Sequence, residues 1–459
     1  FASFYANGSY TLMNRYTLGA SVRMDGSDLF GVDKKYRFLP IYSVSGLYRI
    51  SNEPFFKPAT GWMDNLSLRL SYGLQGNIDK NTSPYLIGTY GTQTILPNNT
   101  ENSISISSAP NDKLRWEKTA SYNIGVDFSV LKSAINLSVD YYYRKGTDLI
   151  GVKNLPLENG FNGMTINWAS MENKGIEVNL QTRNITTRNF SWYTTFNFAY
   201  NYNKVLKDLA STQSLTPGLE GNPAGTIFAI RSKVDPETGR ILIYPKGSNE
   251  AVSVEEYFEM YDESGGLGLY QYNGKADIQR NLYEYAGTTD APYTGGFINT
   301  LNYHNWELSF NFAYNLGAHV RTAPSYSVTE YDPGHNTNRD ILNRWTTENR
   351  SSKLPALVNR NYYSADYYLF ENERTIYKNL DLWVKRLSYV RLQNIRLAYT
   401  LPQEWLHKFN VKGATIGLEG RNLFVFGSSY KNYLDPESMG NLYSTPVPKS
   451  ITFNLSLNF

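Results

Sequence analysis

The last nine residues of the chain alternate between apolar and polar side chains. Ile451, Phe453 and Leu455 share one parity, and Thr452 and Asn454 share the other. Because successive side chains of a β-strand point to opposite faces, this pattern predicts a strand with one apolar face. About thirteen segments of this kind recur along the chain. They include 66–75, 122–130, 135–141, 176–181, 192–200, 306–316 and 395–401, with weaker segments at 2–12, 15–24, 41–50, 293–303 and 414–425.

The connections between these segments fall into two alternating size classes. Short turns are expected near 13–15, 131–133, 184–188 and 304–305. Long connections are expected at about 78–113, 154–163, 206–290, 321–384 and 427–446. Short turns at one end and long loops at the other are typical of an outer-membrane barrel. The sequence therefore predicts an all-β, transmembrane antiparallel β-barrel.

Alternation alone also fits a soluble β-sandwich, so the composition of the two faces matters. The polar faces are rich in Asn, Ser and Thr, which suit a water-filled or plugged lumen better than a sandwich core. The chain contains 38 tyrosines, 22 phenylalanines and 8 tryptophans, an aromatic content of 15%. Rings near strand ends, such as Trp192 and Tyr200, fit the aromatic girdles of a membrane interface.

The number of predicted strands indicates whether the chain could close a barrel by itself. If the chain ends at a periplasmic strand end, about thirteen strands counted backwards place Phe1 at the extracellular end of a strand. An even-stranded barrel would then need an odd number of strands upstream, because an open edge in lipid leaves backbone groups unsatisfied. We expect residues 1–459 to form the C-terminal part of one barrel, with a signal sequence further upstream.

Several motifs, in order along the chain, resemble the SusC/RagA-type TonB-dependent outer-membrane transporters of Bacteroidetes. The resembling pieces are 23–27 with 30–31, 68–73 with 76–77, 114–117 leading to 123–127, 140–142 through 148–150, 173–177, 235–239, 293–296, 344–345 with 348–349, 389–395 with 399–402, and 421–424 with 435–437. Each piece is weak by itself. Their shared order over nearly the whole chain makes the resemblance specific.

The resemblance implies a barrel of about 22 strands around an N-terminal plug. This chain would supply the last thirteen or so strands, and the N-terminal part of its own barrel would supply the rest. The implied partners are a SusD-like surface lipoprotein that closes over the loops, and TonB–ExbB–ExbD acting through the plug. An oligosaccharide or oligopeptide would be the ligand, with outer-membrane lipid around the barrel. A dimer of transporter–lipoprotein pairs is a further assembly that the resemblance allows.

No catalytic or metal-binding pattern is present in the sequence. The charge of 44 Lys+Arg against 41 Asp+Glu gives +3, which does not indicate a nucleic-acid partner. There is no cysteine, and the four histidines have no HExxH spacing. Asp235 to Gly239 reads as turn chemistry and lacks the ligand spacing of an EF-hand. We expect no enzyme activity, no cofactor and no metal.

Two sets of side chains are candidates for function. Charges on the polar faces of strands are expected to point into the lumen, where they pair with one another, meet the plug or contact the substrate; they are Arg23, Asp25, Glu177, Arg396, Glu419 and Arg421. Aromatic and polar residues of the connection 321–384 are the candidate substrate-binding set, or else pack the loops together; they are Tyr326, Tyr331, Asn336, Asp340, Trp345, Tyr362, Tyr363 and Tyr367.

These features together predict TonB-dependent import of an oligomeric nutrient across the outer membrane, with a SusD-like lid. One alternative is a passive porin, against which the long loops argue. A second alternative is a surface glycan-binding β-protein without a pore. The apolar alternation that ends in Phe459 argues against the second alternative, because it matches the end of a membrane strand.

Overall fold

The structure is a computed structural model, and it describes most of the chain. The described residues are 2–26, 38–59, 61–97, 99–161, 163–209, 214–259, 276–328, 334, 336–357, 376–407, 410–427, 435–440 and 444–459. Tyr331, Tyr362, Tyr363 and Tyr367 lie outside them.

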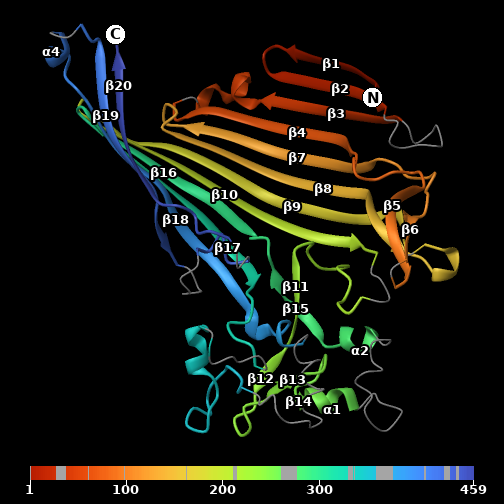
Figure 1. Cartoon of the computed structure of the whole chain (residues 1–459). Coiled ribbons are helices and arrows are strands. Elements are labelled where there is room, and N and C mark those ends of the chain that lie inside the picture. Colours follow the sequence, from red (N-terminus) through yellow and green to blue (C-terminus); the bar gives the residue numbers. More distant parts are fainter. Residues whose placement is uncertain are drawn as a thin grey trace.

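The described residues form a 13-stranded antiparallel sheet. Its strands, in spatial order, are β1 (Ala2–Leu12), β2 (Tyr16–Gly26), β3 (Phe38–Arg49), β4 (Met63–Asn77), β7 (Glu117–Val130), β8 (Ile135–Asn154), β9 (Gly163–Thr186), β10 (Phe190–Lys207), β16 (Tyr293–Tyr303), β17 (Trp306–Arg321), β18 (Val384–Thr400), β19 (Gly413–Phe426) and β20 (Ser450–Asn458). Each strand pairs with the next large strand of the chain, and the sheet curves strongly (Figure 1). The all-β, antiparallel prediction is confirmed.

Strand register joins the predicted apolar positions into continuous rows. One row passes from Leu68 through Val126 and Val139 to Val178 and Phe198, one residue per strand. Such rows are stable because cross-strand neighbours on one face lie about 5 Å apart. Several side chains of this face, such as Ile124, Val126 and Ile176, remain exposed, as expected of a face that meets lipid rather than a protein core.

The two ends of the sheet differ as the connection lengths predict. Met13, Asn14, Leu131, Lys132 and Ser133 have φ between 50° and 58°, the left-handed conformation that tight hairpin turns use. The connection between β3 and β4 at this end carries two 3₁₀-helices, η2 (Ile50–Asn52) and η3 (Pro54–Ala59), and the one between β18 and β19 carries α4 (Gln403–Leu406). The long connections lie at the opposite end (Figure 1). By analogy with the layout of outer-membrane barrels, we propose that the long-loop end is extracellular.

The long connections have structure of their own. The connection 78–116 contains the hairpin β5 (Ile87–Leu96) and β6 (Asn99–Ser108). The other elements in long connections are η4 (Leu157–Asn159), β11 (Thr226–Ile230), β12 (Ser232–Val234), β13 (Ile241–Ile243), β14 (Val252–Ser253), α1 (Val254–Glu259), α2 (Ala276–Arg280), β15 (Tyr283–Thr288), η6 (Arg339–Asn343) and η7 (Asp381–Trp383). No helix in the described ranges is long and apolar enough to span a membrane.

An arginine on the apolar face is expected to destabilise the protein. Phe453 pairs with Leu418 on this face and is 66% exposed. Phe453→Arg should cost ~2–4 kcal/mol because the guanidinium would face hydrocarbon. Thr452→Arg is the matched control, since Thr452 pairs with Glu419 on the polar face. Heat-modifiable gel migration measures the folded fraction, and equal folded fractions for the two variants would contradict this assignment of faces.

Candidate functional site

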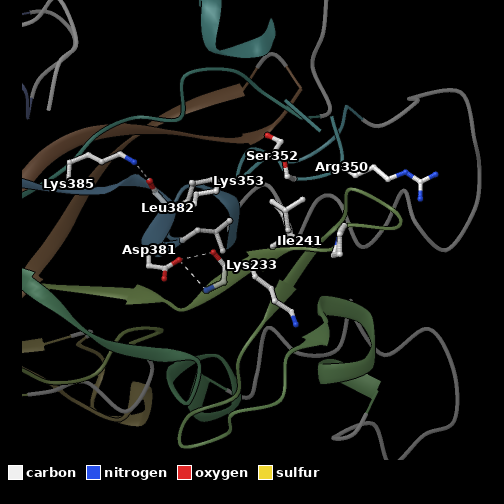
Figure 2. A pocket seen from close by; sticks show the side chains of 13 residues that line it. Lys233, Ile241, Arg350, Ser352, Lys353, Asp381, Leu382 and Lys385 are labelled. Carbon is white, nitrogen blue, oxygen red and sulfur yellow. Dashed lines mark hydrogen bonds between the residues drawn. The ribbon is translucent and has the colours of Figure 1, made fainter. Parts of the chain in front are cut away.

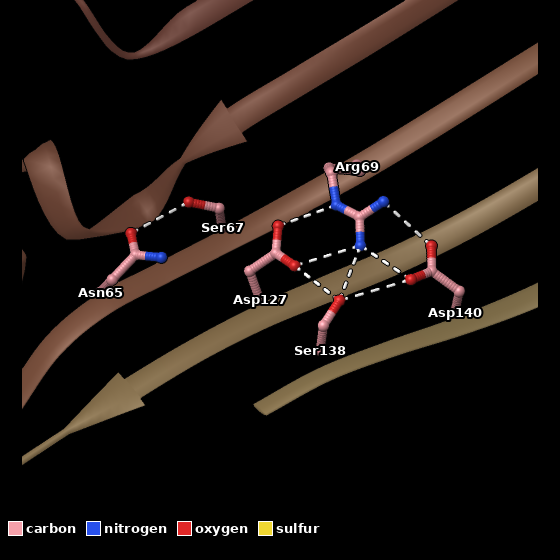
Figure 3. Close-up of polar contacts among 6 residues, drawn as sticks. All are labelled: Asn65, Ser67, Arg69, Asp127, Ser138 and Asp140. Carbon is pink, nitrogen blue, oxygen red and sulfur yellow. Dashed lines mark hydrogen bonds and ion pairs between the residues drawn. The ribbon is translucent and has the colours of Figure 1, made fainter. Parts of the chain in front are cut away.

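The polar face of the sheet carries a charge cluster centred on Arg69 of β4. Register places Ser67 beside Asp127 and Asp127 beside Ser138, while Gly125 lies between Arg69 and Asp140. Arg69 Nε lies 2.8 Å from Asp127 Oδ2, and Arg69 Nη2 lies 2.9 Å from Asp140 Oδ2 (Figure 3). Further hydrogen bonds at 3.0 and 3.1 Å make both ion pairs bidentate. Planar, bidentate pairing of this kind is a property of arginine.

A glycine makes room for this cluster. A Cβ on Gly125 would lie 2.5 Å from Asp140 Oδ1 and 2.7 Å from Arg69 Cζ, closer than real Cβ atoms approach their neighbours. The missing side chain lets the guanidinium cross β7 from β4 to β8. Arg69 and Gly125 are both part of the resembling motifs, yet their spatial pairing depends on register. The one sequence signal that could have found it is an arginine with carboxylates near its own level on the next two predicted strands.

Most of the predicted polar-face charges have partners on their own or adjacent strands. Arg23 Nε lies 2.7 Å from Asp25 Oδ1, and Arg421 Nε lies 2.5 Å from Glu419 Oε1. Arg396 forms an ion pair with Glu307 on β17. These contacts are the mutual pairing that we expect of lumenal charges.

Glu177 is exposed and stands next to Asp140 in the register, beside the Arg69 cluster. The sequence candidates therefore fall into three separate regions of the sheet, with Arg23 and Asp25 on β2, Glu177 on β9, and the rest on β18 and β19. Arg396 and Glu419 are register partners on β18 and β19, whereas Glu177 belongs with the strands that carry Arg69. Contact of any of these charges with a plug or a substrate stays a prediction.

A second cluster attaches a long connection to the wall. The side chain of Arg391 on β18 is 2% exposed, and its Nε lies 2.8 Å from Glu437 Oε1. The same guanidinium pairs with Asp435. The amide of Glu437 also donates to Asp435 Oδ1 at 3.0 Å, which closes a turn over the arginine. Residues 435–440 of the connection 427–449 are thus held against β18 by a buried charge.

The two longest connections, 208–292 and 322–383, join into one unit at the long-loop end of the sheet, here called the loop body. Its shared core contains Ile230, Ile243, Tyr257, Leu282, Tyr326, Tyr377, Leu380 and Trp383, among others. The amide of Ile230 donates to the carbonyl of Asn379 at 2.9 Å, and the amide of Ala356 donates to the carbonyl of Gly239 at 2.9 Å. The core and these bonds fix the two connections to each other.

The predicted substrate residues occupy different parts of the loop body. Tyr326 is 4% exposed, donates to the carbonyl of Pro355 at 2.6 Å, and has its pKa raised by burial. Trp345 is half-buried and donates to the carbonyl of Pro236 at 3.0 Å. Asn336 is exposed, and Asp340 is half-buried in η6. Tyr326 and Trp345 thus make the loop-packing contacts of the alternative reading, while substrate contact stays a prediction.

Trp345 fixes the turn from Asp235 to Gly239. Gly239 has φ +72°, and a Cβ there would lie 2.5 Å from the indole of Trp345. Asp235 accepts from the Thr238 hydroxyl at 2.5 Å and from the Glu237 amide at 3.1 Å. These hydrogen bonds lower the pKa of Asp235 below its ordinary value. The turn chemistry predicted for this segment is confirmed.

A basic pocket of about 530 Å³ opens where β12, β13, residues 350–353 and residues 380–385 meet (Figure 2). Four cations line it, namely Lys233, Arg350, Lys353 and Lys385, against the single carboxylate of Asp381. Asp381 accepts from the amide and the hydroxyl of Ser232 at 3.1 and 2.7 Å, and so bridges the two connections.

Lys385 Nζ donates to the Leu382 carbonyl at 2.6 Å beside the pocket. Arg350 pairs with Glu237 at 3.0 Å at the edge of the pocket. The lining thus keeps a net excess of positive charge after its ion pairs are counted, which suits a ligand with carboxylates. Within the described ranges, no group of three or more His, Cys, Asp or Glu side chains is placed to hold a metal ion.

The lipid-facing apolar rows, the charged opposite face and the long loops at one end define a large outer-membrane β-barrel protein. The sequence model of the family described as "TonB dependent receptor-like, beta-barrel" matches residues 1–316. The chain belongs to this family and is an outer-membrane protein. The predicted family and location are confirmed.

Named relatives agree with this assignment. The chain is 30% identical to TonB-dependent receptor P26 of Formosa agariphila, with 100% of this chain and 46% of the relative covered. It is 26% identical to TonB-dependent receptor SusC of Bacteroides thetaiotaomicron, and the match covers 99% of this chain and 43% of SusC. The chain therefore spans less than half the length of these relatives.

The fold also matches a solved transporter. A structure of the RagAB peptide importer in a closed-closed state superposes with a TM-score of 0.78 at 23% identity, covering 100% of this chain and 47% of that chain. An open-open state of the same importer gives a TM-score of 0.76 at 24% identity. These similarities establish that the strand arrangement is that of a TonB-dependent receptor barrel.

Removing the bidentate arginine is expected to weaken the wall. Arg69→Lys should lower the free energy of unfolding by ~1–3 kcal/mol, because a lysine cannot hold both carboxylates in planar pairs. Arg183→Lys is the control, since the exposed Arg183 donates to the Lys132 carbonyl. Urea unfolding in detergent, followed by tryptophan fluorescence, measures the difference. Equal midpoints for the two variants would show that the cluster adds no stability.

Breaking the second cluster should release residues 435–440. Arg391→Met leaves Asp435 and Glu437 without their buried cation, at a cost of ~3–5 kcal/mol. Arg421→Met is the control, because this side chain is 61% exposed and exposed pairs are worth ~0–1 kcal/mol. Limited proteolysis with mass-spectrometric mapping should show new cleavage at 435–440 for Arg391→Met. Resistance equal to that of the control would contradict the attachment.

Proposed function

We propose that this chain forms wall and extracellular loops of an active importer for an oligomeric nutrient, an oligosaccharide or an oligopeptide. The observation that carries the proposal is the loop body, in which two long connections share one core around a basic pocket at the extracellular end. A passive pore needs no such built structure over its mouth. A loop body of this kind provides a surface for ligand capture.

A lid is the second part of the proposal. We infer that a SusD-like surface lipoprotein docks on the loop body, and the likeness to SusC and to the RagAB importer supports this inference. The RagAB structures are described as those of a peptide transporter. Peptide is thus one ligand class for this chain, and oligosaccharide is the other.

The pocket narrows the chemistry of the ligand. Lys353 lies in the connection 322–383 and Lys385 lies at the start of β18, with Lys233 across the pocket on β12. Cations in a partly desolvated pocket favour carboxylates, which acidic oligosaccharides and oligopeptides both carry. A ligand carboxylate held here would be oriented at the mouth of the barrel.

Energy coupling requires parts beyond the strands described. The outermost strands β1 and β20 each pair with one neighbour among the described residues, and a sheet edge in lipid leaves backbone groups unpaired. We propose that further strands of the same protein close the barrel. A plug inside it would transmit force from TonB–ExbB–ExbD, and the charged wall would face this plug.

The test is uptake of a fluorescently labelled oligopeptide or oligosaccharide pool by cells that express the full-length protein. Deleting TonB should abolish import and leave surface binding in place, while deleting the SusD-like lipoprotein should lower binding as well. Lys353→Gln with Lys385→Gln should reduce binding of acidic ligands several-fold more than that of neutral ones. Unchanged import without TonB would refute energy coupling and favour the passive porin.

A further inference from the structure

The outward face of β7 to β10 changes character at its extracellular end. Register aligns Tyr122, Tyr143, Lys174 and Tyr202 in one row across these four strands. The next row outward brings Lys145, Glu172 and Lys204 together. Both rows continue the parity of the apolar face, since Tyr141 and Ile176 lie directly before them. The aromatic row is therefore followed by a cationic one.

The height of the cationic row coincides with the boundary of the apolar band. Ten residues separate Ile135, at the short-turn end of β8, from Lys145. At ~3.3 Å per residue and a tilt of ~40°, this corresponds to about 25 Å along the membrane normal. The apolar band of an outer-membrane barrel is also about 25 Å tall. Lys145 and Lys204 thus stand where outer-leaflet headgroups begin.

Positive charge in this patch exceeds negative charge. In the part of the chain that the structure describes, no ion pair joins Lys145, Lys174 or Lys204 to a carboxylate. Glu172 is the single acid in the two rows, and its carboxylate accepts from the Tyr143 hydroxyl at 3.1 Å. Lys174 Nζ lies 5.0 Å from the centre of the Tyr202 ring. Its ammonium is thereby held beside an aromatic ring at the interface.

We propose that Lys145, Lys174 and Lys204, here called the lysine patch, bind phosphate groups of outer-leaflet lipid. Charge complementarity and position select this partner, because the patch faces away from the polar face of the sheet and directly adjoins the lipid-facing rings. Lysines at such positions can lay their stems along apolar surface while their ammonium groups reach the headgroup layer. Lys207, further along β10, has its Nζ 3.4 Å from the centre of the exposed Trp168 ring and extends the cationic region outward.

The test is native mass spectrometry of the full-length protein titrated with monophosphoryl lipid A and with its dephosphorylated form. A lysine near a charged membrane surface contributes about fivefold in affinity, so Lys145→Gln, Lys174→Gln and Lys204→Gln together should weaken binding of the phosphorylated lipid on the order of a hundredfold. Binding of the dephosphorylated lipid should not change. Replacing the same three lysines with arginine should retain binding of the phosphorylated form.

Controls separate this proposal from its rivals. Lys246→Gln removes one exposed cation from the loop body and should leave lipid binding unchanged. Heat-modifiable migration verifies that each variant is folded. Equal weakening for both lipids would indicate loss of apolar contact and overturn the proposal. If inorganic phosphate bound Lys145, Lys174 and Lys204 as tightly as the lipid does, the proposal would also be overturned, because the site would then be one for free phosphate. Unchanged binding by the triple glutamine variant would refute it outright.

Discussion

Backbone hydrogen bonding in lipid is the constraint on which the rest of the structure depends. Hydrocarbon offers no partner for an N–H or C=O group, so each membrane strand must be paired along its length. Pairing fixes register, and register fixes which side chains share a face. The row that contains Leu68, Val126 and Val139 and the opposite row that contains Asp127 and Ser138 are two results of the same ladder.

Charges on the inner wall follow from this ladder. Side chains that cannot face lipid must be satisfied across strands, and Arg69 does so only because Gly125 leaves the space between. Arg391 uses the same principle to hold a loop segment through Asp435 and Glu437. At the extracellular end, water satisfies the backbone, so the long connections are free to build a body with a hydrophobic core of their own.

Much of the sheet could be predicted from the sequence, and little of the site could. Period-two alternation is a local pattern, so it predicts a strand at 293–303 with the same first and last residues as β16. Pairing of Arg69 with Asp140 spans 71 residues and depends on register. The loop body depends on contacts such as Ser232 with Asp381, 149 residues apart. Aromatic composition alone does not distinguish a ring such as Tyr326, packed in a core, from one that awaits a ligand.

The central claim is that one parity of each strand faces water inside the barrel and the other faces lipid. The chain has no cysteine, so a single introduced cysteine is the only thiol of this part of the protein, and the unsubstituted full-length protein gives the background rate. Leu70→Cys, Ser71→Cys and Tyr72→Cys place a thiol at three successive positions of β4 in the full-length protein. A small, hydrophilic methanethiosulfonate reagent should modify the cysteine at 71 rapidly and those at 70 and 72 slowly. Equal rates at all three positions would contradict the account.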